Sequence, residues 1–582
     1  MKINWLITML FSIFLVACLD QGPDSDGNSD TGNQDPPIDD NNDDDPADTP
    51  PVPTVTISGK LEYQDRIYNA NGFISGNTPM KPIRQVVVEI VNTDNEVIAT
   101  TTTDNLGNYS VEEIPEGENK VRIIAETQSA AGQTISVRTH GNIQYSVSKT
   151  FTFDGDNTVA DIQLLLGERV AGIYNMLDVM SSGFEFFDAL SPDHIQLQNL
   201  NIFWQYGQAI GSYTCFTTSG GSCVNGPGVY VLSDPFSSTD TDDFDDDVLW
   251  HEFAHFIEYS LGQTESPGGA HSLSNNQIDL RLAWSEGHAT YLQMAIKTWL
   301  RATHPERLSI PGFLATSHYV DNKATSPVIS VDYANLIGSQ YRNATNEAAI
   351  SKSLWFLQDR SGIDVVWQPV IDYLSGNSTA DTFEAFWDGL IATRNPSSIL
   401  LSQWQSTLSE RAIHYQKDAQ EDDNEIVDAA NFDCTVTDSI YPATCINGQT
   451  GYLYSQSTVA DKDMYALSLT AGVTYQIATD NLRNGADTKI SLLDVNGNEL
   501  LDNNSDPLVN DDAFDCELQL GGCNPLHDGT HFSSALEYTP STDITVYLLV
   551  QSSSAMYDDP TNYGYLARYG DYDLTVTAIS GP

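Results

Sequence analysis

The hydrophobic positions along the chain follow two different periods, which divide it into three structured regions. Residues 54–166 consist of short runs rich in Val, Ile and Thr, separated by Gly, Asn, Pro and Asp, a pattern typical of β-strands joined by turns. Residues 167–416 mix such runs with longer segments whose apolar residues recur at helical spacing, and residues 446–582 return to β patterning. We therefore predict a multidomain protein with a β-sandwich at each end and an α+β domain between them.

Individual elements can be placed within these regions. In the first region the predicted strands cover 55–61, 85–91, 97–103, 121–125 and 134–138. In the middle region we expect strands within 194–204 and 228–232, and helices at 174–190, 248–257, 277–300, 346–357 and 382–391.

Two polar segments flank these regions. Residues 19–53 are rich in Asp, Asn and Pro and nearly free of large apolar side chains. Such a segment cannot bury a core, so we expect a disordered, self-repelling acidic tether. Residues 417–445 begin with an acidic, polar stretch, and we predict a linker there.

The N-terminus has the features of an export signal. Lys2 precedes an apolar run, residues 5–17, that is too short to span a membrane comfortably. The run ends in Leu-Val-Ala-Cys, which resembles the lipobox of bacterial lipoproteins. The resemblance implies that residues 1–18 form a lipoprotein signal peptide and that Cys18 becomes a lipid-modified N-terminus. Leu19, in place of Asp, favours anchoring in the outer membrane, at its periplasmic face or at the cell surface. The alternative is an ordinary signal peptide with a Cys there by chance.

The composition narrows the expected ligands. The chain carries 25 Lys and Arg against 80 Asp and Glu, a formal net charge of −55. Such a surface repels nucleic acid and anionic lipid head groups, so we expect neither as a partner. The acidity suits an exported protein that meets cations such as Ca²⁺. General acidity tuned for solubility in a saline habitat explains it equally well.

The cysteines agree with export. Seven are present, and with Cys18 set aside for lipid an even number remains, which predicts disulfides in an exported protein. Local pairing requires the least folding, although other connectivities are open. The local pairs are Cys215–Cys223, Cys434–Cys445 and Cys516–Cys523.

The predicted helix at 248–257 carries the chemistry that organises the middle region. His251, Glu252 and His255 form an H-E-x-x-H motif. Residues four apart in a helix lie about one turn apart, so both imidazoles can bind one divalent metal ion. Glu252 is then placed to accept a proton from a metal-activated water. At ~100° per residue, the apolar side chains fall on the opposite side, so the helix presents both histidines to a cleft. A helix carrying the motif by chance is the alternative.

A third ligand would separate a metal site from a chance motif. The metzincin extension requires Gly and His where the chain has Glu258 and Leu261, so that class is excluded. Glu286 lies in the middle of the predicted helix at 277–300 among apolar neighbours, where a carboxylate needs a charge partner such as a metal ion. It is therefore our first candidate. The second is His271, followed by Asp279 and His288.

Two segments carry a resemblance to a known class of enzymes. Residues 245–257, DDDVLWHEFAHFI, and residues 283–291, AWSEGHATY, resemble gluzincin-type zinc metallopeptidases, which include thermolysin-like and fungalysin-like enzymes. The resemblance covers about fifty residues. It implies a zincin-like α+β domain with Zn²⁺ bound by His251, His255 and Glu286, and with Glu252 as the catalytic base. Thirty residues separate the last two ligands, more than in the thermolysin pattern, so residues 263–276 look like an inserted loop.

The flanking regions also resemble known domains. Residues 102–109, TTDNLGNY, and 114–117, IPEG, resemble the carboxypeptidase regulatory-like domain, a small transthyretin-like β-sandwich. Residues 461–475, 485–497 and 570–576 resemble the bacterial pre-peptidase C-terminal domain, a jelly-roll-like β-sandwich found beside secreted peptidases.

Two acidic stretches are candidates for binding a structural cation such as Ca²⁺. Residues 237–247 directly precede the motif helix. For these residues we favour helix capping, which stabilises a helix by ~0.3–1 kcal/mol per residue, over binding of a structural cation. The Asp-rich turns at 502–512 fit either structural Ca²⁺ or simple turn chemistry.

The resemblance implies a surface-anchored, monomeric zinc endopeptidase that hydrolyses extracellular polypeptides with a metal-activated water and Glu252 as general base. A further oxyanion donor is expected, with His318, Tyr319 and Tyr341 as candidates. The alternative is a catalytically inactive peptidase-fold lipoprotein that acts in surface binding or adhesion. The intact Glu252 favours the enzyme.

Overall fold

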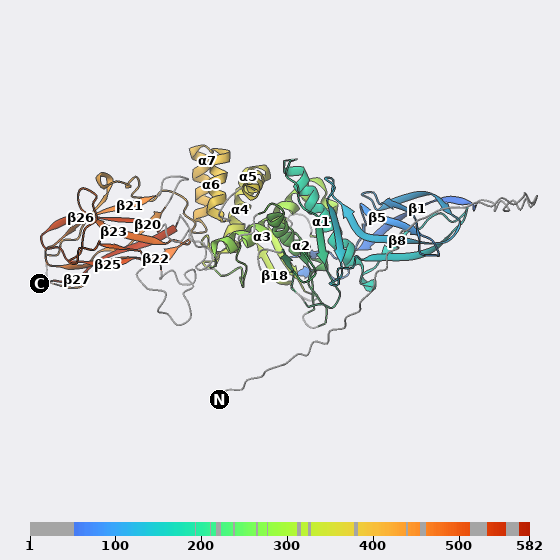
Figure 1. Cartoon of the computed structure of the whole chain (residues 1–582), viewed down its shortest axis with the longest axis horizontal. Helices are drawn as coiled ribbons and strands as arrows, with labels where there is room; N and C mark the ends of the chain where they lie inside the picture. Colours follow the sequence, from blue (N-terminus) through green and yellow to red (C-terminus); the bar gives the residue numbers. More distant parts are fainter. Residues whose placement is uncertain are drawn as a thin grey trace, which may run out of the picture. The chain divides into compact units, whose positions relative to one another are not determined.

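The structure of the chain is a computed structural model. It describes residues 52–192, 194–209, 211–216, 223–236, 239–262, 266–275, 278–310, 316–323, 327–376, 382–437, 440–453, 461–511, 532–553 and 570–581. The predicted signal peptide, Cys18, nearly all of the tether and the pair Cys516–Cys523 lie outside these residues. The described residues form a β-rich N-terminal part, a middle part with seven α-helices and a C-terminal β region, so the multidomain mixture of α and β is present (Figure 1).

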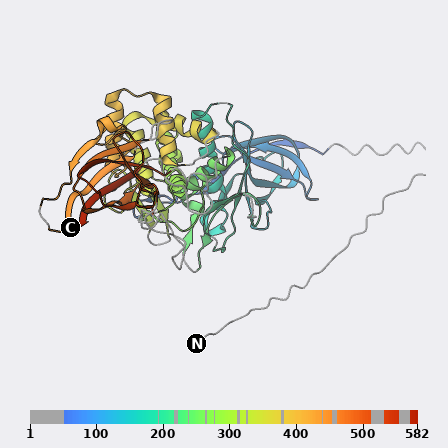
Figure 2. The same cartoon turned by 60° about the vertical axis from the view of Figure 1, so that its left-hand side comes forward.

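The N-terminal part, drawn in blue to teal in Figure 2, contains two main sheets and the short antiparallel pair β2-β3. The smaller sheet has the order β11-β1-β4, with β7 also paired to β1. The larger sheet has the order β13-β14-β12-β9-β8-β5-β6, with β10 also paired to β8. The strands before residue 166 are β1 (Thr54–Gln64), β2 (Tyr68–Asn69), β3 (Gly72–Phe73), β4 (Met80–Pro82), β5 (Val86–Val91), β6 (Val97–Thr102), β7 (Asn108–Pro115), β8 (Gly117–Gln128), β9 (Thr134–Arg138), β10 (Ser146–Phe153) and β11 (Ile162–Leu164).

The larger sheet continues beyond the boundary that we predicted at residue 166. Strand β12 (Leu200–Phe203) pairs in parallel with β9, and β14 (Gly228–Tyr230) pairs in parallel with β12. Strand β13 (Tyr213–Cys215) is antiparallel to β14 at the end of the sheet. Hydrophobic patterns show which segments are strands but not which strands pair across a hundred residues, so the sequence did not reveal this continuity.

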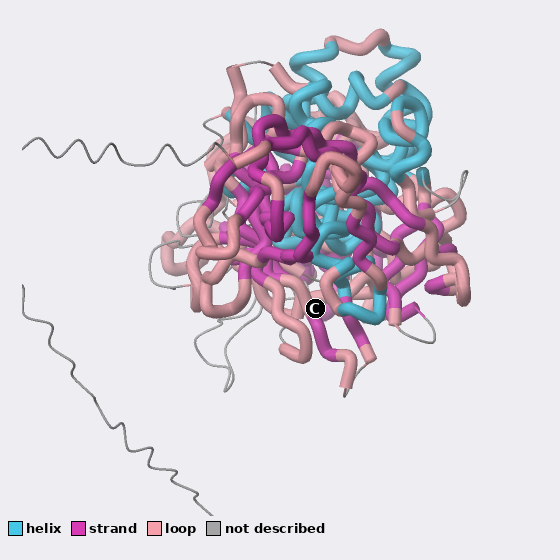
Figure 3. Tube along the Cα trace, turned by 90° about the vertical axis from the view of Figure 1, so that its right-hand side faces the viewer, coloured by secondary structure: helices cyan, strands magenta, loops and turns pink. Residues whose placement is uncertain are grey.

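The helices belong to the middle part and are drawn in cyan in Figure 3. They are α1 (Ala171–Leu190), α2 (Asp246–Ser260), α3 (Leu280–Thr303), α4 (Glu347–Ser361), α5 (Ile363–Ser375), α6 (Phe383–Arg394) and α7 (Ser398–Ser409). All five predicted helices are present, with ends shifted by a few residues, whereas α5 and α7 were not predicted. Among the described residues, no helix combines the length and the apolar content needed to cross a membrane.

Short elements precede, connect and follow these helices. They are η1 (Leu166–Glu168), β15 (Ser233–Asp234), β16 (Asp240–Thr241), η2 (Asp242–Phe244), η3 (Pro305–Arg307), β17 (His318–Asn322), β18 (Pro327–Asp332) and η5 (Ile426–Asp428). Strands β15 and β16 form one antiparallel pair, and β17 and β18 form another.

Helix α2 buries one face, as its pattern predicted. Val248, Leu249, Phe253, Phe256 and Ile257 are each at most 6% exposed. The close packing of α1 beneath α2 depends on a glycine: a Cβ at Gly183 would lie 2.7 Å from the ring of Phe253. Helix α1 in turn rests on the larger sheet, where the Tyr174 hydroxyl donates to the carbonyl of Ile123 in β8 at 2.9 Å. This stack holds the motif helix rigidly against the sheet.

The C-terminal region forms two sheets around a hydrophobic core of its own. Their orders are β19-β21-β26-β23-β24 and β20-β27-β22-β25. The strands are β19 (Ala430–Asp433), β20 (Ala443–Leu453), β21 (Lys462–Leu469), β22 (Thr474–Arg483), β23 (Thr488–Leu493), β24 (Val509–Asn510), β25 (Ala535–Tyr538), β26 (Ile544–Ser552) and β27 (Gly570–Ser580). Strand β19 and the start of β20 fall within residues 417–445, where we predicted a linker, because four residues are too few to display an alternating pattern.

Two of the three predicted cysteine pairs fall within the described residues. The structure joins Cys215 to Cys223, with Cα atoms 5.8 Å apart, and Cys434 to Cys445, with Cα atoms 5.1 Å apart. Both are local, as expected from the sequence. The first bridge closes a loop directly after β13 and therefore holds the end of that strand.

Candidate metal centre and its cleft

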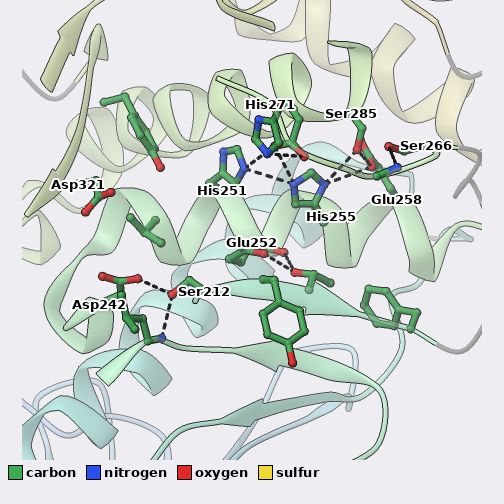
Figure 4. Close-up of a pocket in the computed structure, with 18 residues that line it drawn as sticks. Ser212, Asp242, His251, Glu252, His255, Glu258, Ser266, His271, Ser285 and Asp321 are labelled. Carbon is green, nitrogen blue, oxygen red and sulfur yellow. Dashed lines mark hydrogen bonds and ion pairs between the residues drawn. The ribbon is translucent and has the colours of Figure 1, made fainter. Parts of the chain in front are cut away.

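Helices α2 and α3, together with β13 and β17, line an open cavity of about 490 Å³. Figure 4 shows the side chains that line it, with the imidazoles of His251, His255 and His271 directed toward one another. The first two come from α2, which presents them on the side opposite its buried face. The cavity is therefore the cleft that the helical pattern predicted.

His251, His255 and Glu286 are brought together by α2 and α3, and we call them the His/Glu cluster. Nε2 of His251 lies 3.1 Å from Oε2 of Glu286 and 3.3 Å from Nε2 of His255. Nε2 of His255 lies 3.5 Å from the same Glu286 oxygen. A tetrahedral ion with bonds of ~2.0–2.1 Å places its ligand atoms ~3.3 Å apart. The three atoms therefore have the spacing of ligands that could hold one metal ion.

The other nitrogen of each imidazole is also held. Nδ1 of His251 lies 3.2 Å from Oγ1 of Thr290. Nδ1 of His255 lies 3.1 Å from Oγ of Ser285, which donates to Oε2 of Glu258 at 2.7 Å. Hydrogen bonds of this kind fix the orientation of metal-binding imidazoles. Both ligands are thus oriented by side chains of the same two helices.

Electrostatics favour charge separation within the cluster. Burial opposes ionisation of Glu286, but the charge of His255 and the hydrogen bond from His251 outweigh it and hold the Glu286 pKa well below its usual value. Burial likewise opposes protonation of His255, yet Glu286 and Glu258 raise its pKa well above the usual value. Against burial, hydrogen bonds from His255 and His288 lower the pKa of Glu258 to about 2. Both glutamates are therefore ionised, and a bound cation would take the place of the proton that these charges hold on His255.

Glu252 lies in the same cleft but not among the three converging ligands. It is 6% exposed, and Oγ1 of Thr214 in β13 donates to its Oε2 at 2.7 Å. This hydrogen bond fixes one carboxylate oxygen and leaves the other for a reacting group. The position fits a general base rather than a metal ligand.

The rival third ligands have other partners. Asp279 caps α3 by accepting from the backbone N–H of Arg281 at 2.9 Å. His288 is fully buried, with Nδ1 3.1 Å from Oε1 of Glu258. His271 lies in the cleft, where its Nδ1 is 2.7 Å from Oε2 of Glu347 and its Nε2 is 3.6 Å from Oε1 of Glu286. His271 thus belongs to the surroundings of Glu286 and forms a second, overlapping candidate set with Glu347.

Of the three candidate oxyanion donors, Tyr319 lines the cleft. Its ring lies 6.0 Å from that of His251. Burial raises its pKa well above the usual value, and the charges of Asp321 and Glu252 add to the shift. The phenol therefore stays protonated and able to donate. His318 and Tyr341 do not line the cavity.

Three further carboxylates, Asp240, Asp242 and Asp321, meet in the cleft region, and we call them the Asp cluster. They offer oxygens that lie within 4.8 Å of one another. Burial raises the pKa of Asp242 well above its usual value against the hydrogen bond from Ser212, and the charge of Asp321 adds to this. Burial and the charge of Asp240 raise the pKa of Asp321 to about 7.

The acidic stretch before α2 does not cap it as we predicted. Asp245, the N-cap residue, makes no capping hydrogen bond with its side chain, which accepts from the backbone N–H of Asn322 at 2.9 Å. Asp247 accepts from the backbone N–H of Val320 at 2.9 Å and from Nζ of Lys297 at 2.7 Å. These side chains therefore connect β17 and α3 to the start of α2. They form hydrogen bonds and an ion pair with buried groups of those elements in place of capping hydrogen bonds to the end of the helix.

Several residues of the site were not found from the sequence. Thr214, Ser285, Thr290 and Glu258 support the cluster without belonging to its motif. Thr290 had a signal, since it lies four residues after Glu286 and therefore on the same face of α3. Thr214 had none, because its approach to α2 depends on how the sheet packs.

Comparisons with known proteins add little. No protein family and no curated protein matches the sequence. Among solved structures, the chain is similar to a "putative carbohydrate binding protein" from Pseudomonas aeruginosa, at 17% identity over 20% of this chain and 92% of that one, with a TM-score of 0.13. A likeness this slight carries no argument about fold or function.

Proposed function

We propose that the protein is a zinc metallopeptidase of gluzincin type, with His251, His255 and Glu286 as zinc ligands and Glu252 as general base. The observation that carries the proposal is the spacing of 3.1, 3.3 and 3.5 Å among the three ligand atoms. Two imidazole nitrogens and one carboxylate oxygen form a donor set that zinc accepts in catalytic sites. The held Nδ1 atoms of both imidazoles also fit this role.

The residues around the centre have distinct parts in the proposed reaction. When bound, zinc would polarise the scissile carbonyl and lower the pKa of a water molecule. Glu252 accepts the proton of that water and returns it to the leaving amine. Thr214 keeps the Glu252 carboxylate turned toward the cleft through its hydrogen bond. Tyr319 donates its phenolic proton in a hydrogen bond to the oxyanion that develops on the substrate.

An extended polypeptide suits the shape of the cleft. Strand β13 is the last strand of the larger sheet, and Tyr213 and Thr214 of this strand line the cavity. Among the described strands, none pairs with its outer edge. A substrate in extended conformation can add to such an edge through backbone hydrogen bonds. This mode of binding presents a peptide bond of the substrate to Glu252.

The remaining parts of the proposal concern the flanking regions and the location. We assign the N-terminal part to a transthyretin-like sandwich, the middle part to a zincin-like domain and the C-terminal region to a jelly-roll-like sandwich; the two-sheet organisation at both ends supports this assignment. Anchoring in the outer membrane through Cys18 rests on the sequence motif, and the disulfides are consistent with an oxidising compartment.

Zinc analysis and proteolysis test the function together. Purified wild-type protein is expected to contain one zinc ion per chain and to degrade casein. Glu252→Gln is expected to keep the zinc and to lose activity by a factor of roughly 10²–10⁴, because only the base is removed. Glu306→Gln, which changes a carboxylate that is 69% exposed, is the control for the loss of one charge. Absence of zinc, or full activity of Glu252→Gln, would reject the proposal.

A further inference from the structure

Three carboxylates from different elements converge at one end of the cleft. Asp240 belongs to β16, Asp242 to η2 and Asp321 to β17. Figure 4 shows Asp242 and Asp321 at the end of the cavity opposite Ser285 and Glu258. The cluster shares no residue with the His/Glu cluster, and its oxygens lie within 4.8 Å of one another. Like charges at this separation repel each other unless something binds between them.

Each of these carboxylates has an oxygen in need of a partner. Among the described residues, Oδ1 of Asp240, Oδ1 of Asp242 and Oδ1 of Asp321 are all buried and make no hydrogen bond. Asp242 is only 5% exposed. Its other oxygen accepts from Oγ of Ser212, which itself accepts from the backbone N–H of Leu232. A buried carboxylate oxygen without a partner is costly, so the cluster is built for a ligand that supplies positive charge.

The charge balance indicates a divalent ion. Among the described residues, Lys323 pairs with the cluster, with Nζ 3.9 Å from Oδ2 of Asp240. Three carboxylates and one ammonium leave two negative charges when all are ionised. One divalent cation neutralises the remaining charge of the cluster.

The donor atoms indicate the class of ion. All three side chains offer oxygen and none offers nitrogen or sulfur, which suits a hard cation and not zinc. The shielded oxygens also argue against a Lys or Arg side chain of a substrate, because a side chain entering from the cleft cannot reach them as a small ion can. We propose that Asp240, Asp242 and Asp321 form a calcium site that is separate from the proposed zinc centre.

Calcium at this position would act on the cleft through β17. Tyr319 and Asp321 are two residues apart, so both lie on the same side of the strand and line the cavity. The intervening Val320 is bound to Asp247 through its backbone N–H at 2.9 Å, and Asn322 is bound to Asp245 in the same way. One edge of the strand is thus already fastened to the start of α2. An ion bound to Asp321 would hold the face that carries both side chains, and so hold Tyr319 at its place beside the centre.

Calcium titration of the full-length, zinc-loaded protein tests this site. After removal of calcium by a chelating resin and restoration of zinc, the number of bound Ca²⁺ ions is measured by calorimetry. Titration extends to several millimolar because extracellular sites have Kd values of about 10⁻⁴–10⁻³ M. Asp321→Asn and Asp242→Asn are each expected to bind one Ca²⁺ fewer per chain than wild type. Asp359→Asn, an exposed carboxylate of α4, is expected to bind the wild-type number.

Thermal unfolding supplies a second measurement. CaCl₂ is expected to raise the Tm of wild type and of Asp359→Asn, and to raise it less in the variants of the Asp cluster. Asp240→Asn removes the most exposed edge of the cluster and serves if Asp242→Asn does not fold. No substrate is present in either experiment, so the result is independent of the peptidase proposal.

An unchanged calcium number in folded Asp321→Asn and Asp240→Asn overturns the proposal. A second result also overturns it: these variants bind the wild-type number of Ca²⁺ ions but selectively lose cleavage of peptides that contain Lys or Arg. The cluster would then bind a cationic side chain of the substrate.

Discussion

The two clusters of the cleft place carboxylates in opposite situations. In the His/Glu cluster, the Glu286 carboxylate faces two imidazoles at 3.1 and 3.5 Å, and the outer nitrogen of each imidazole meets a hydroxyl group. In the Asp cluster, three carboxylates face one another, and each has a buried oxygen without a hydrogen-bond partner among the described residues. In the first arrangement the groups pair with one another, whereas in the second we propose that a bound ion supplies the missing partner.

This difference shows that closeness of acidic groups does not by itself define a catalytic metal site. The clusters differ in donor type and in the hydrogen bonds that orient the donors. The His/Glu cluster offers imidazole nitrogens held in a fixed orientation, whereas the Asp cluster offers carboxylate oxygens without hydrogen-bond partners among the described residues. The first combination suits an ion that must keep an open position for chemistry. The second suits an ion that binds structural segments together.

The largest effect is expected from the carboxylate of the His/Glu cluster itself. Glu286→Gln removes the negatively charged ligand, so zinc affinity is expected to fall by more than ~100-fold. This loss exceeds the ~10–100-fold loss expected when a residue that only hydrogen-bonds to a ligand is changed. Zinc content after gel filtration and casein hydrolysis should both drop to background. The calcium number should stay at the wild-type value, since the Asp cluster shares no residue with this site.

Glu347→Gln is the informative control for that experiment. Glu347 contacts His271, which in turn approaches the other oxygen of Glu286. If zinc were held by His271, Glu286 and Glu347, this variant would lose zinc as well, while His251→Ala would not. We expect the reverse, because Glu347 and Glu286 contact different nitrogens of His271, whereas His251 and His255 both approach the same oxygen of Glu286.

An intermediate effect is expected from Tyr319, which lies between the two clusters. Tyr319→Phe removes one hydrogen-bond donor for the oxyanion, so kcat is expected to fall by roughly 10²–10³-fold with little change in KM. Zinc and calcium contents should not change, because the phenol is a ligand in neither cluster. Tyr341→Phe, outside the cavity, should have wild-type kinetics. A rise in KM alone would mean that Tyr319 binds substrate and does not stabilise the transition state.

The parts of the site that follow from local geometry were predictable from the sequence. The helical period fixes the relation between His251 and His255, and it also places the apolar face of α2 opposite them. Glu286 was chosen because the gluzincin resemblance implies a glutamate ligand on the next helix, and because an ionised group among apolar helical neighbours needs a partner. Both arguments use only the sequence around Glu286.

What the sequence could not show depends on pairing across long separations. Asp321 reaches Asp242 because β17 is fastened to the start of α2 by Asp245 and Asp247, and no pattern in either segment encodes that contact. The same applies to the parallel pairing of β9 with β12, which carries the larger sheet past residue 166. At Asp245 the local preference gave a wrong prediction. Its side chain does not cap α2 and instead accepts a hydrogen bond from the backbone N–H of Asn322.

The smallest effect is expected from Glu258, which supports the His/Glu cluster from its outer side. Glu258 accepts from Ser285, whose hydroxyl lies beside Nδ1 of His255, and it also contacts His288. Glu258→Gln keeps the size of the side chain but removes its charge, so the His255 imidazole becomes a weaker ligand. Zinc affinity is expected to fall by roughly 10–100-fold, and kcat at saturating zinc should stay near wild type. Competition with a zinc-binding dye measures the change, with Glu306→Gln as the control. An unchanged zinc affinity would mean that the hydrogen bonds around Glu258 stabilise the fold and do not tune the metal ligands. The two clusters would then differ only in the type of their donor atoms.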